Sequence, residues 1–334
     1  MSSWIKRIFL LVLCLTLLAA AGLRWYASSP LNLRADRVQF SIKPGSSLRS
    51  ATRQIVDSGI ELGAWRFNLL VRVLDKAGAI KAGSYEVSRG ITPLALLDKL
   101  TSGDVVHAEV KFLEGWTFRQ LRAALNADPD LRHDSADLSD SDIMARLGAG
   151  DRSPEGLFFP DTYRFGAGTS DIEVIKRAYA AMDKHLQSAW EQRAPDLPYR
   201  EPYEALIMAS VIEKETGQSN ERALVAGVFV NRLRMGMLLQ TDPTVIYGMG
   251  DKFDGKLRTK DLRADTPHNT YTRAGLPPTP IAMPGLAALQ AALNPADTDA
   301  LYFVARGDGS SEFSRTLAEH ERAVSNYRRQ KKKR

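Results

Sequence analysis

The sequence has very few of the residues that build covalent or metal-bound sites. Its 334 residues include one cysteine, Cys14, which lies in an apolar N-terminal run. A single cysteine excludes disulfides within the chain and thiolate metal clusters, and it leaves the rest of the chain without a cysteine nucleophile. The five histidines are scattered without a pair at ligand spacing, so the sequence predicts neither a metal nor a cofactor.

Glycine and proline are also too few, 40 residues together, for a collagen-like or low-complexity chain. With 44% hydrophobic and 25% charged residues, the chain has the composition of a folded protein. Its net charge of +6 comes from residues 328–334, which carry six cations, and the remainder has 39 basic and 39 acidic residues. A neutral body excludes a basic binding face, so we expect no nucleic-acid partner.

Residues 8–23 form an almost unbroken apolar run. Sixteen helical residues at ~1.5 Å each span ~24 Å, which is less than the ~30 Å hydrocarbon core of a bilayer. Trp4 before the run and Trp25-Tyr26 after it extend the span with interfacial aromatic residues. We predict a retained membrane anchor, and the competing interpretation is a signal peptide cleaved near residues 19–21.

The cations on the two sides of this run are nearly balanced, so charge alone does not orient the span. A short tail, an apolar run and a long polar body are typical of an exported protein with an N-terminal anchor. We therefore expect the body to lie outside the cytoplasm.

Hydrophobic patterning predicts an α+β chain in several parts. The first folded part repeats short strand–helix units, which resemble LysM-like domains that grip N-acetylated glycans; a structural spacer is the alternative. The second is mostly helical with a few short strands, and is the expected catalytic domain. The predicted parts are a cytoplasmic tail and transmembrane helix (1–27), a linker (28–36), the LysM-like domain (37–115), the helical domain (116–327) and a basic tail (328–334).

The most informative segment is a predicted helix over residues 203–216, whose centre is almost wholly apolar. Glu213-Lys214-Glu215 falls in its last turn, where each carboxylate opposes the helix dipole by ~0.3–1 kcal/mol at exposed sites. Acidic residues are unfavourable at the C-terminal end of a helix, and a residue placed against such a local preference is often functional. Apolar walls would also raise the pKa of a glutamate and keep it a proton donor near neutrality.

The two glutamates differ in what they face, because residues two apart on a helix lie ~200° apart. Glu213 lies above Ala209 and Ser210, whose small side chains could leave a cleft, and Glu215 lies on the opposite face. Spacing alone leaves two interpretations open: one glutamate is catalytic, or one or both carboxylates are simply solvated.

Several short motifs occur in order along the chain, and with them the sequence resembles the endolytic murein transglycosylases of the MltG (YceG-like) type. The resemblance runs from the apolar N-terminus to the C-terminus. The motifs are residues 155–156 (EG), 159–163 (FPDTY), 209–216 (ASVIEKET), 231–233 (NRL), 240–248 (QTDPTVIYG), 269–271 (NTY) and 275–278 (GLPP).

The resemblance implies that Glu213 is the catalytic residue and that the substrate is a peptidoglycan glycan strand. Polar residues of the motifs are then expected to bind the substrate, namely Glu215, Asn231, Gln240, Thr241, Asp242, Asn269 and Tyr271. Other roles stay open for three of them. Asp242 before Pro243 is typical of a helix N-cap, and Gln240 and Asn269 could equally tie loops together.

The implied reaction is lytic cleavage of the MurNAc-β-1,4-GlcNAc bond of nascent strands, which leaves a 1,6-anhydro-MurNAc end and limits strand length. One acid suffices because the sugar supplies its own nucleophile, whereas hydrolysis needs a second carboxylate. The alternatives are a hydrolytic muramidase using Glu213 and Glu215, and a non-catalytic peptidoglycan-binding scaffold.

The implied location is the bacterial inner (cytoplasmic) membrane. The chain would cross it once, with the N-terminus cytoplasmic and the catalytic body periplasmic, beside membrane-bound peptidoglycan synthases (penicillin-binding proteins).

Overall fold

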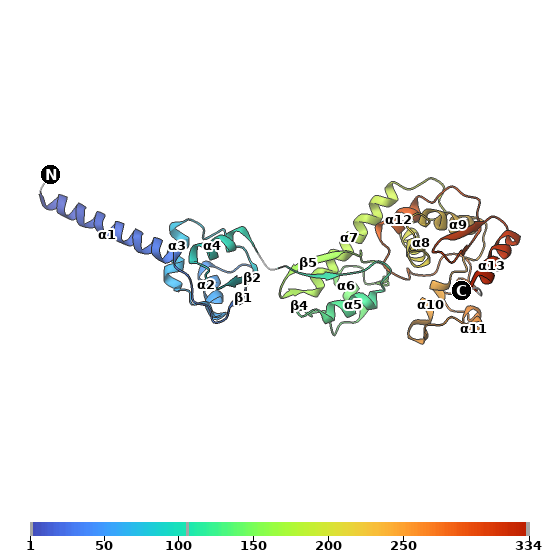
Figure 1. Ribbon diagram of the computed structural model, residues 1–334, viewed down its shortest axis with the longest axis horizontal. Helices are drawn as coiled ribbons and strands as arrows, with labels where there is room; N and C mark the ends of the chain where they lie inside the picture. Colours follow the sequence, from blue (N-terminus) through green and yellow to red (C-terminus); the bar gives the residue numbers. More distant parts are fainter. Residues whose placement is uncertain (1–2, 105–106, 332–334) are drawn as a thin grey trace. The chain divides into compact units, whose positions relative to one another are not determined.

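The computed structural model describes residues 3–104 and 107–331, which mix helices and strands as expected (Figure 1). The chain divides into two compact units. The N-terminal unit comprises Met1–Glu109 and Arg164–Thr169, and the C-terminal unit comprises Val110–Tyr163 and Ser170–Arg334.

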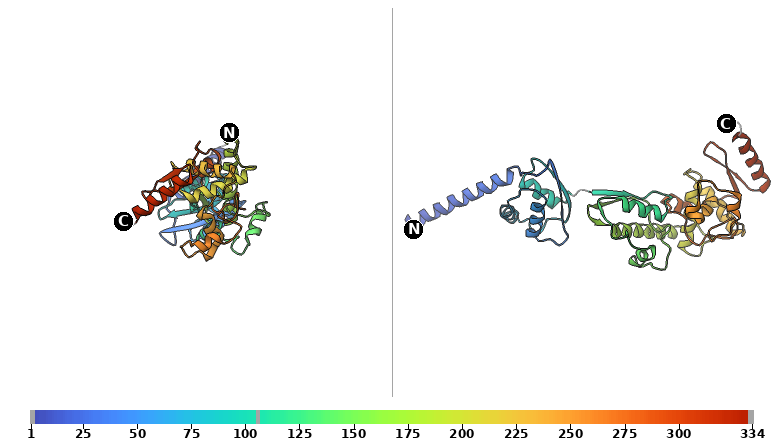
Figure 2. Two further views of the ribbon diagram at one scale, coloured as in Figure 1. Left: turned by 90° about the vertical axis from the view of Figure 1, so that its right-hand side faces the viewer. Right: turned by 90° about the horizontal axis from the view of Figure 1, so that it is seen from below.

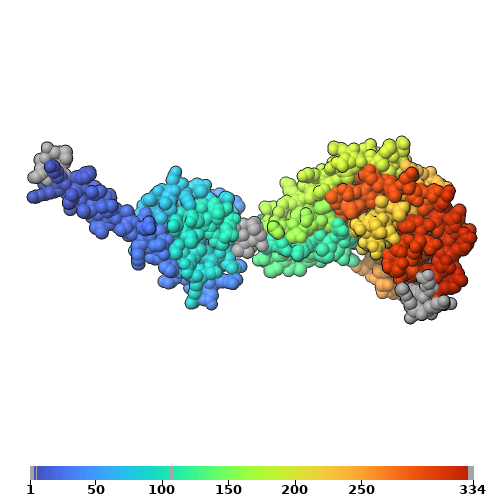
Figure 3. Space-filling model, turned by 45° about the horizontal axis from the view of Figure 1, so that its top comes forward, coloured from blue at the N-terminus to red at the C-terminus, as the bar shows by residue number. Residues whose placement is uncertain are grey.

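Helix α1 (Ser3–Ser28) begins the N-terminal unit. Its stretch Lys6–Ser28 is the one helix among the described residues that is long and apolar enough to cross a membrane. The dark-blue part of α1 stands clear of other atoms on the face drawn in Figure 3, and Figure 2 shows it projecting from its unit. Its last turn is different, because Tyr26 and Ala27 are buried against Leu70.

A two-stranded antiparallel sheet forms the centre of the N-terminal unit. Strand β1 (Arg37–Ile42) pairs with β2 (Gly83–Ser88), with Val38 opposite Val87. Alternate residues of β1 are buried, as the period-2 pattern predicts. The helices of this unit's body are α2 (Leu48–Asp57), α3 (Ala64–Val73) and α4 (Pro93–Ser102).

Local signals predict some boundaries in this unit correctly. The Thr92 hydroxyl caps α4 by accepting a hydrogen bond from the Ala95 N–H, and Pro93 is the first helical residue. The predicted linker, residues 28–36, lies against the unit: Leu31 is buried, its N–H donates to the Ile91 carbonyl, and Leu33 bridges to Ile60. Helix α1 and the residues that follow it therefore pack directly against the body of this unit.

The first part of the C-terminal region alternates short strands with helices. Strand β3 pairs with β5, and β4 pairs with β6. The sequence of residues 105–113 predicts a strand, of which residues 105–106 lie outside the described residues and β3 forms part of the remainder. The elements are β3 (His107–Lys111), α5 (Phe118–Ala127), β4 (Leu131–Arg132), α6 (Asp140–Arg146), β5 (Thr162–Gly166), β6 (Thr169–Ser170) and α7 (Asp171–Glu191).

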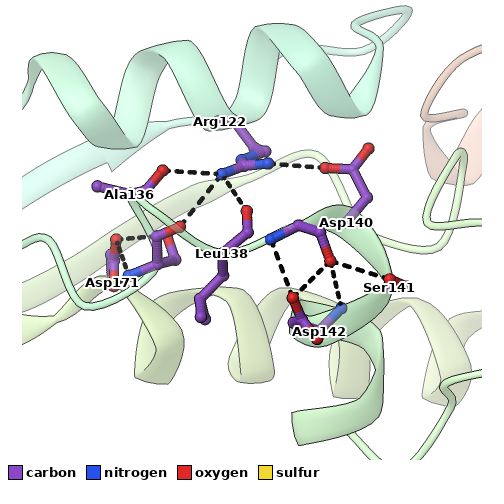
Figure 4. Close-up of polar contacts among 9 residues, drawn as sticks. Arg122, Ala136, Leu138, Asp140, Ser141, Asp142 and Asp171 are labelled. Atoms are coloured by element: carbon purple, nitrogen blue, oxygen red, sulfur yellow. Dashed lines mark hydrogen bonds and ion pairs between the residues drawn. The ribbon is translucent and has the colours of Figure 1, made fainter.

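Two charged side chains hold the loop between β4 and α6 (Figure 4). The Arg122 guanidinium of α5 donates to the carbonyls of Ser135 and Leu138 and pairs with Asp140 at 2.8 Å. Asp171, buried at the start of α7, accepts from the Ser135 N–H and hydroxyl. These hydrogen bonds order the acidic, serine-rich stretch of residues 134–142.

The second part packs around one buried helix, α8 (Pro202–Glu215). Its residues 205–212 are all buried, and α8 contacts α7, α9, α10 and α12. Residues 306–309 (RGDG) predict a hairpin turn, and the structure has an antiparallel hairpin there between the last two strands. The elements after α8 are α9 (Arg222–Arg234), α10 (Asp242–Met249), η1 (Gly250–Lys252), α11 (Thr259–Arg263), α12 (Leu286–Leu293), β7 (Tyr302–Ala305), β8 (Ser311–Ser314) and α13 (Leu317–Lys331).

The last helix continues into the predicted basic tail, since α13 reaches Lys331. Residues 332–334 lie outside the described residues.

Candidate active site

Glu213 lies in the last turn of α8, and its side chain is only 7% exposed. Its Oε2 accepts a hydrogen bond from the Gly285 N–H at 3.0 Å, and its Oε1 lies 3.5 Å from the Arg222 guanidinium. Gly285 is the N-cap of α12, so the carboxylate lies at the positive end of a second helix dipole. The dipole at the end of α8 is thereby partly offset.

Burial raises the pKa of Glu213 above its ordinary value. The Gly285 hydrogen bond lowers it, the charge of Glu114 raises it, and Arg222 lowers it. Because burial and a like charge outweigh the donors, this carboxyl group keeps its proton to higher pH than a solvated glutamate. That is the property a general acid needs.

Glu114 is a second carboxylate beside Glu213, and sequence patterns did not reveal it. A Cβ added to Gly285 would lie 1.8 Å from Oε1 of Glu114, so this side chain lies directly over Gly285. The Gly115 N–H donates to the Met283 carbonyl at 2.8 Å. In the sequence, Glu114 is merely the acid before a turn, with no spacing that pairs it with α8.

The backbone after Glu114 runs beside the segment that leads into α12. The N–H of Met283 donates to the Trp116 carbonyl at 2.7 Å, which completes a two-bond ladder with the contact from Gly115. The Lys214 ammonium donates to the Gly115 carbonyl at 3.1 Å. These bonds hold both acids and the Gly285 donor in one cluster.

The expectation of a cleft over Ala209 and Ser210 is wrong. Another segment of the chain fills the space above these two residues. Both residues are fully buried, and the Ser210 hydroxyl accepts from the Ile281 N–H at 3.0 Å. Their small side chains let the segment 280–285 approach α8. Gly156 also lets this segment approach closely, since a Cβ added to Gly156 would lie 2.4 Å from Cβ of Pro280.

Glu155, which precedes that glycine, is also buried. Its carboxylate accepts from the Phe118 N–H at the start of α5 and from the Tyr247 side chain. Burial raises the pKa of Glu155 to about 7. Glu155 thus joins α5, α10 and the Gly156 turn, which packs against Pro280 of the segment 280–285.

Glu215 faces away from Glu213, as the helical spacing predicts. The Thr241 hydroxyl donates to Glu215, and among the described residues the two glutamates share no hydrogen-bond partner. Burial raises the pKa of Glu215 to about 7, the Thr241 bond lowers it, and the charge of Asp242 raises it.

Three other predicted site residues gather around Glu215. Thr241 is buried and its N–H donates to the Thr270 hydroxyl, while the Tyr271 hydroxyl donates to Asp242 at 2.5 Å. Asp242 does not cap α10 as expected, because the N-cap is Thr241 and no side-chain cap bond forms. Its carboxylate instead meets Tyr271.

The three remaining predicted residues occupy different surroundings. Asn231 donates to the carbonyls of Thr298 and Ala300. Asn269 is fully buried, and its amide group donates to Ala264 and other carbonyls while accepting from the Tyr271 N–H.

Gln240 is exposed, with a positive φ of 50° and its N–H bonded to the Thr270 carbonyl. Of these three amide side chains, that of Gln240 is the one open to a ligand. In the described ranges, no group of three His, Cys, Asp or Glu residues is placed to hold a metal ion.

Comparison with known proteins agrees with the motifs. A family model described as the YceG-like family matches residues 40–326, a range that includes Glu114, Glu155, Glu213 and Glu215. The chain belongs to this family.

Relatives of this YceG-like chain carry the name endolytic murein transglycosylase. The Bacillus subtilis (strain 168) protein is 32% identical over 312 residues, covering 87% of this chain and 84% of that protein. The Streptococcus pneumoniae (strain D39) protein is 26% identical, and the match covers 94% of this chain but 63% of that protein. A crystal structure of a YceG-like protein from Listeria monocytogenes is 30% identical, with a TM-score of 0.56, covering 86% of this chain and 98% of that one.

Proposed function

We propose that this protein is an endolytic murein transglycosylase, a lyase that cleaves peptidoglycan glycan strands with Glu213 as its acid and base. One observation carries the proposal. Glu213 is buried, has a raised pKa, and lies between the Gly285 N–H and the Arg222 guanidinium. The names of its relatives supply the substrate class.

The reaction uses the carboxyl group of Glu213 twice, first as an acid and then as a base. The protonated carboxyl group gives it to the oxygen that links N-acetylmuramic acid to N-acetylglucosamine, and the bond from C1 to that oxygen breaks. The N-acetyl carbonyl stabilises the cationic C1. The ionised Glu213 then removes the proton of the muramoyl 6-hydroxyl, whose oxygen bonds to C1 and closes the 1,6-anhydro ring.

The neighbours of Glu213 suit both halves of this cycle. Burial and Glu114 favour the protonated form before cleavage. Gly285 and Arg222 stabilise the carboxylate once the proton has left. Nε of Arg222 is buried and has no hydrogen-bond partner among the described residues.

A single-acid reaction fits the contacts better than hydrolysis by Glu213 and Glu215. Hydrolysis needs a second carboxylate beside the reacting carbon. Glu215 is instead bonded to Thr241 on the other face of α8. We infer that Glu215, Thr241, Asp242 and Tyr271 shape a neighbouring sugar site with the exposed Gln240, and that Asn231 and Asn269 hold its loops.

We also propose that α1 is retained as a single-pass anchor in the bacterial inner membrane, with the body periplasmic. The length and apolar surface of Lys6–Ser28 support this. Tethering confines the enzyme near membrane-bound peptidoglycan synthases, where it would limit the length of nascent strands. The strand–helix units of the N-terminal unit support a LysM-like, glycan-binding role there.

Purified, uncrosslinked glycan strands provide the test. Glu213→Gln should abolish cleavage and keep the fold, while Glu191→Gln, an exposed glutamate in the last turn of α7, serves as the matched control. Products of the native protein should have the mass of anhydro ends. Reducing ends would establish a muramidase, and full turnover by Glu213→Gln would overturn the assignment.

A further inference from the structure

The N-terminal unit carries an exposed apolar stripe beside the anchor helix. Trp65, Leu69 and Val73 follow one another at four-residue spacing on α3, and they are 68%, 44% and 62% exposed. Side chains at this spacing share one side of a helix. Single exposed apolar residues are ordinary, but a continuous stripe marks an interaction surface.

A groove of about 400 Å³ separates this stripe from α1. Ala19, Gly22 and Trp25 line it from α1, and Trp65 and Leu69 line it from α3. The groove is open at Gly22, where an added Cβ would meet nothing within 4 Å. Figure 1 draws the end of α1 next to α3.

The residues that line the groove show at which level of the apolar span α3 lies. Ala19 and Gly22 belong to the apolar run of residues 8–23, and from Ala19 to the end of that run the helix rises only ~6 Å. Because Trp65 and Leu69 line the same groove as these residues, they lie level with the last turns of the span.

Helix and body are also joined without a flexible hinge. α1 is continuous from Ser3 to Ser28, and its last turn is buried against Leu70 of α3. A membrane that surrounds the apolar run therefore meets α3 as well.

The chemistry of this face matches a lipid interface. Tryptophan concentrates at the boundary between headgroups and acyl chains, and Trp25 is 70% exposed at the same end of α1. The Arg66 guanidinium lies 5.4 Å from the Trp65 ring centroid and lines the groove, which places a cation beside the apolar surface. The phosphate of a lipid headgroup is an anion that the Arg66 guanidinium can bind.

We infer that the α1–α3 face is a membrane-docking surface. The stripe of α3 inserts into the interface of the leaflet in which α1 ends, and the groove holds one phospholipid acyl chain whose phosphate meets Arg66. The inference rests on the proposed anchoring by α1. It makes the N-terminal unit a part of the membrane anchor and sets the orientation of this unit on the bilayer.

Tryptophan fluorescence in vesicles tests the depth of α3. The full-length protein is reconstituted in vesicles of phosphatidylethanolamine and phosphatidylglycerol that contain phospholipid brominated in the upper acyl chain. In one variant Trp65 is the sole tryptophan, and in a matched variant Trp190 of α7 is; the other tryptophans are changed to phenylalanine. We expect Trp65 to lose most of its fluorescence and Trp190 to keep it.

Equal quenching of the two tryptophans in protein that floats with the vesicles would overturn the docking surface and leave the anchor intact. Failure to float would overturn both, and strand cleavage assayed on the same samples reports separately on the enzyme. A second copy of this chain, docked through the same α3 stripe, is the competing occupant. Leu69→Cys in a Cys14→Ser background tests it, because a high yield of disulfide-linked dimer in dilute vesicles would replace the lipid with a protein partner, whereas monomer supports the lipid.

Discussion

The Oε2 atom of Glu213 accepts a hydrogen bond from the backbone N–H of Gly285 at 3.0 Å. This bond joins the C-terminal end of α8 to the N-terminal end of α12. It satisfies an otherwise free N–H at a helix start and gives the acid a donor that strengthens when the proton leaves. The position of one glycine therefore controls the position of the acid.

Gly285→Ala should reduce strand cleavage at least tenfold while the protein stays folded. The new methyl group would overlap the Glu114 carboxylate, from which a Cβ lies 1.8 Å away, and would push it from the site. Gly78→Ala is the control, because nothing lies within 4 Å of its added Cβ. Unchanged kcat in Gly285→Ala, with an unchanged circular dichroism spectrum, would contradict the role given to this glycine.

Glu114→Gln should move the alkaline limb of the pH–activity profile to lower pH. Glu114 raises the pKa of Glu213, so removing its charge lowers that pKa and the general acid loses its proton earlier as pH rises. Arg222→Gln should move the same limb to higher pH, because Arg222 lowers the pKa. Shifts in the same direction for both variants would refute this account, and Glu191→Gln should leave the profile unchanged.

Glu155→Gln should make the free energy of unfolding less dependent on pH. The folded pKa of Glu155 is about 7, above its ordinary 4.5, so the folded state binds more protons between these values. Stability from this group is complete below pH ~4.5 and is lost as pH rises through ~7, by ~1.4 kcal/mol per unit of pKa difference. Urea unfolding from pH 5 to pH 8 measures this, and parallel curves for variant and native protein would disprove it.

Thr241→Val should destabilise the protein by ~1–3 kcal/mol, since it removes a donor to the buried Glu215 carboxyl group. Thr259→Val, at an exposed position in α11, is the matched control. Thermal unfolding monitored by circular dichroism compares them. Equal melting temperatures of the two variants would show that the Thr241 bond contributes little.

Glu215→Gln should lower strand cleavage less than Glu213→Gln. Its carboxyl group contacts Thr241 rather than the Gly285 and Arg222 donors, so it is expected to shape a sugar site and not to transfer the proton. Initial rates on purified strands decide this, and a complete loss with an unchanged fold would move Glu215 into the proton-transfer step.

Much of the local structure follows from the sequence alone, because caps, turns and periodicity act between near neighbours. Thr92 and Pro93 start α4, the apolar run of α8 ends at its two glutamates, and a hairpin turns near Gly307. The same local signals placed Glu213 and Glu215 on opposite faces of one helix. The motifs then identified the family that the comparisons show.

What lies against these elements was decided by tertiary structure. Glu114 meets Gly285 beside Glu213, and the backbone at Ile281 covers Ser210 where a cleft was expected. Such contacts join segments far apart in the chain, so no local pattern encodes them. The raised pKa of Glu213 has the same origin, because the side chain that supplies the carboxyl group is local, whereas its burial and its charged neighbours come from the packing of the whole unit.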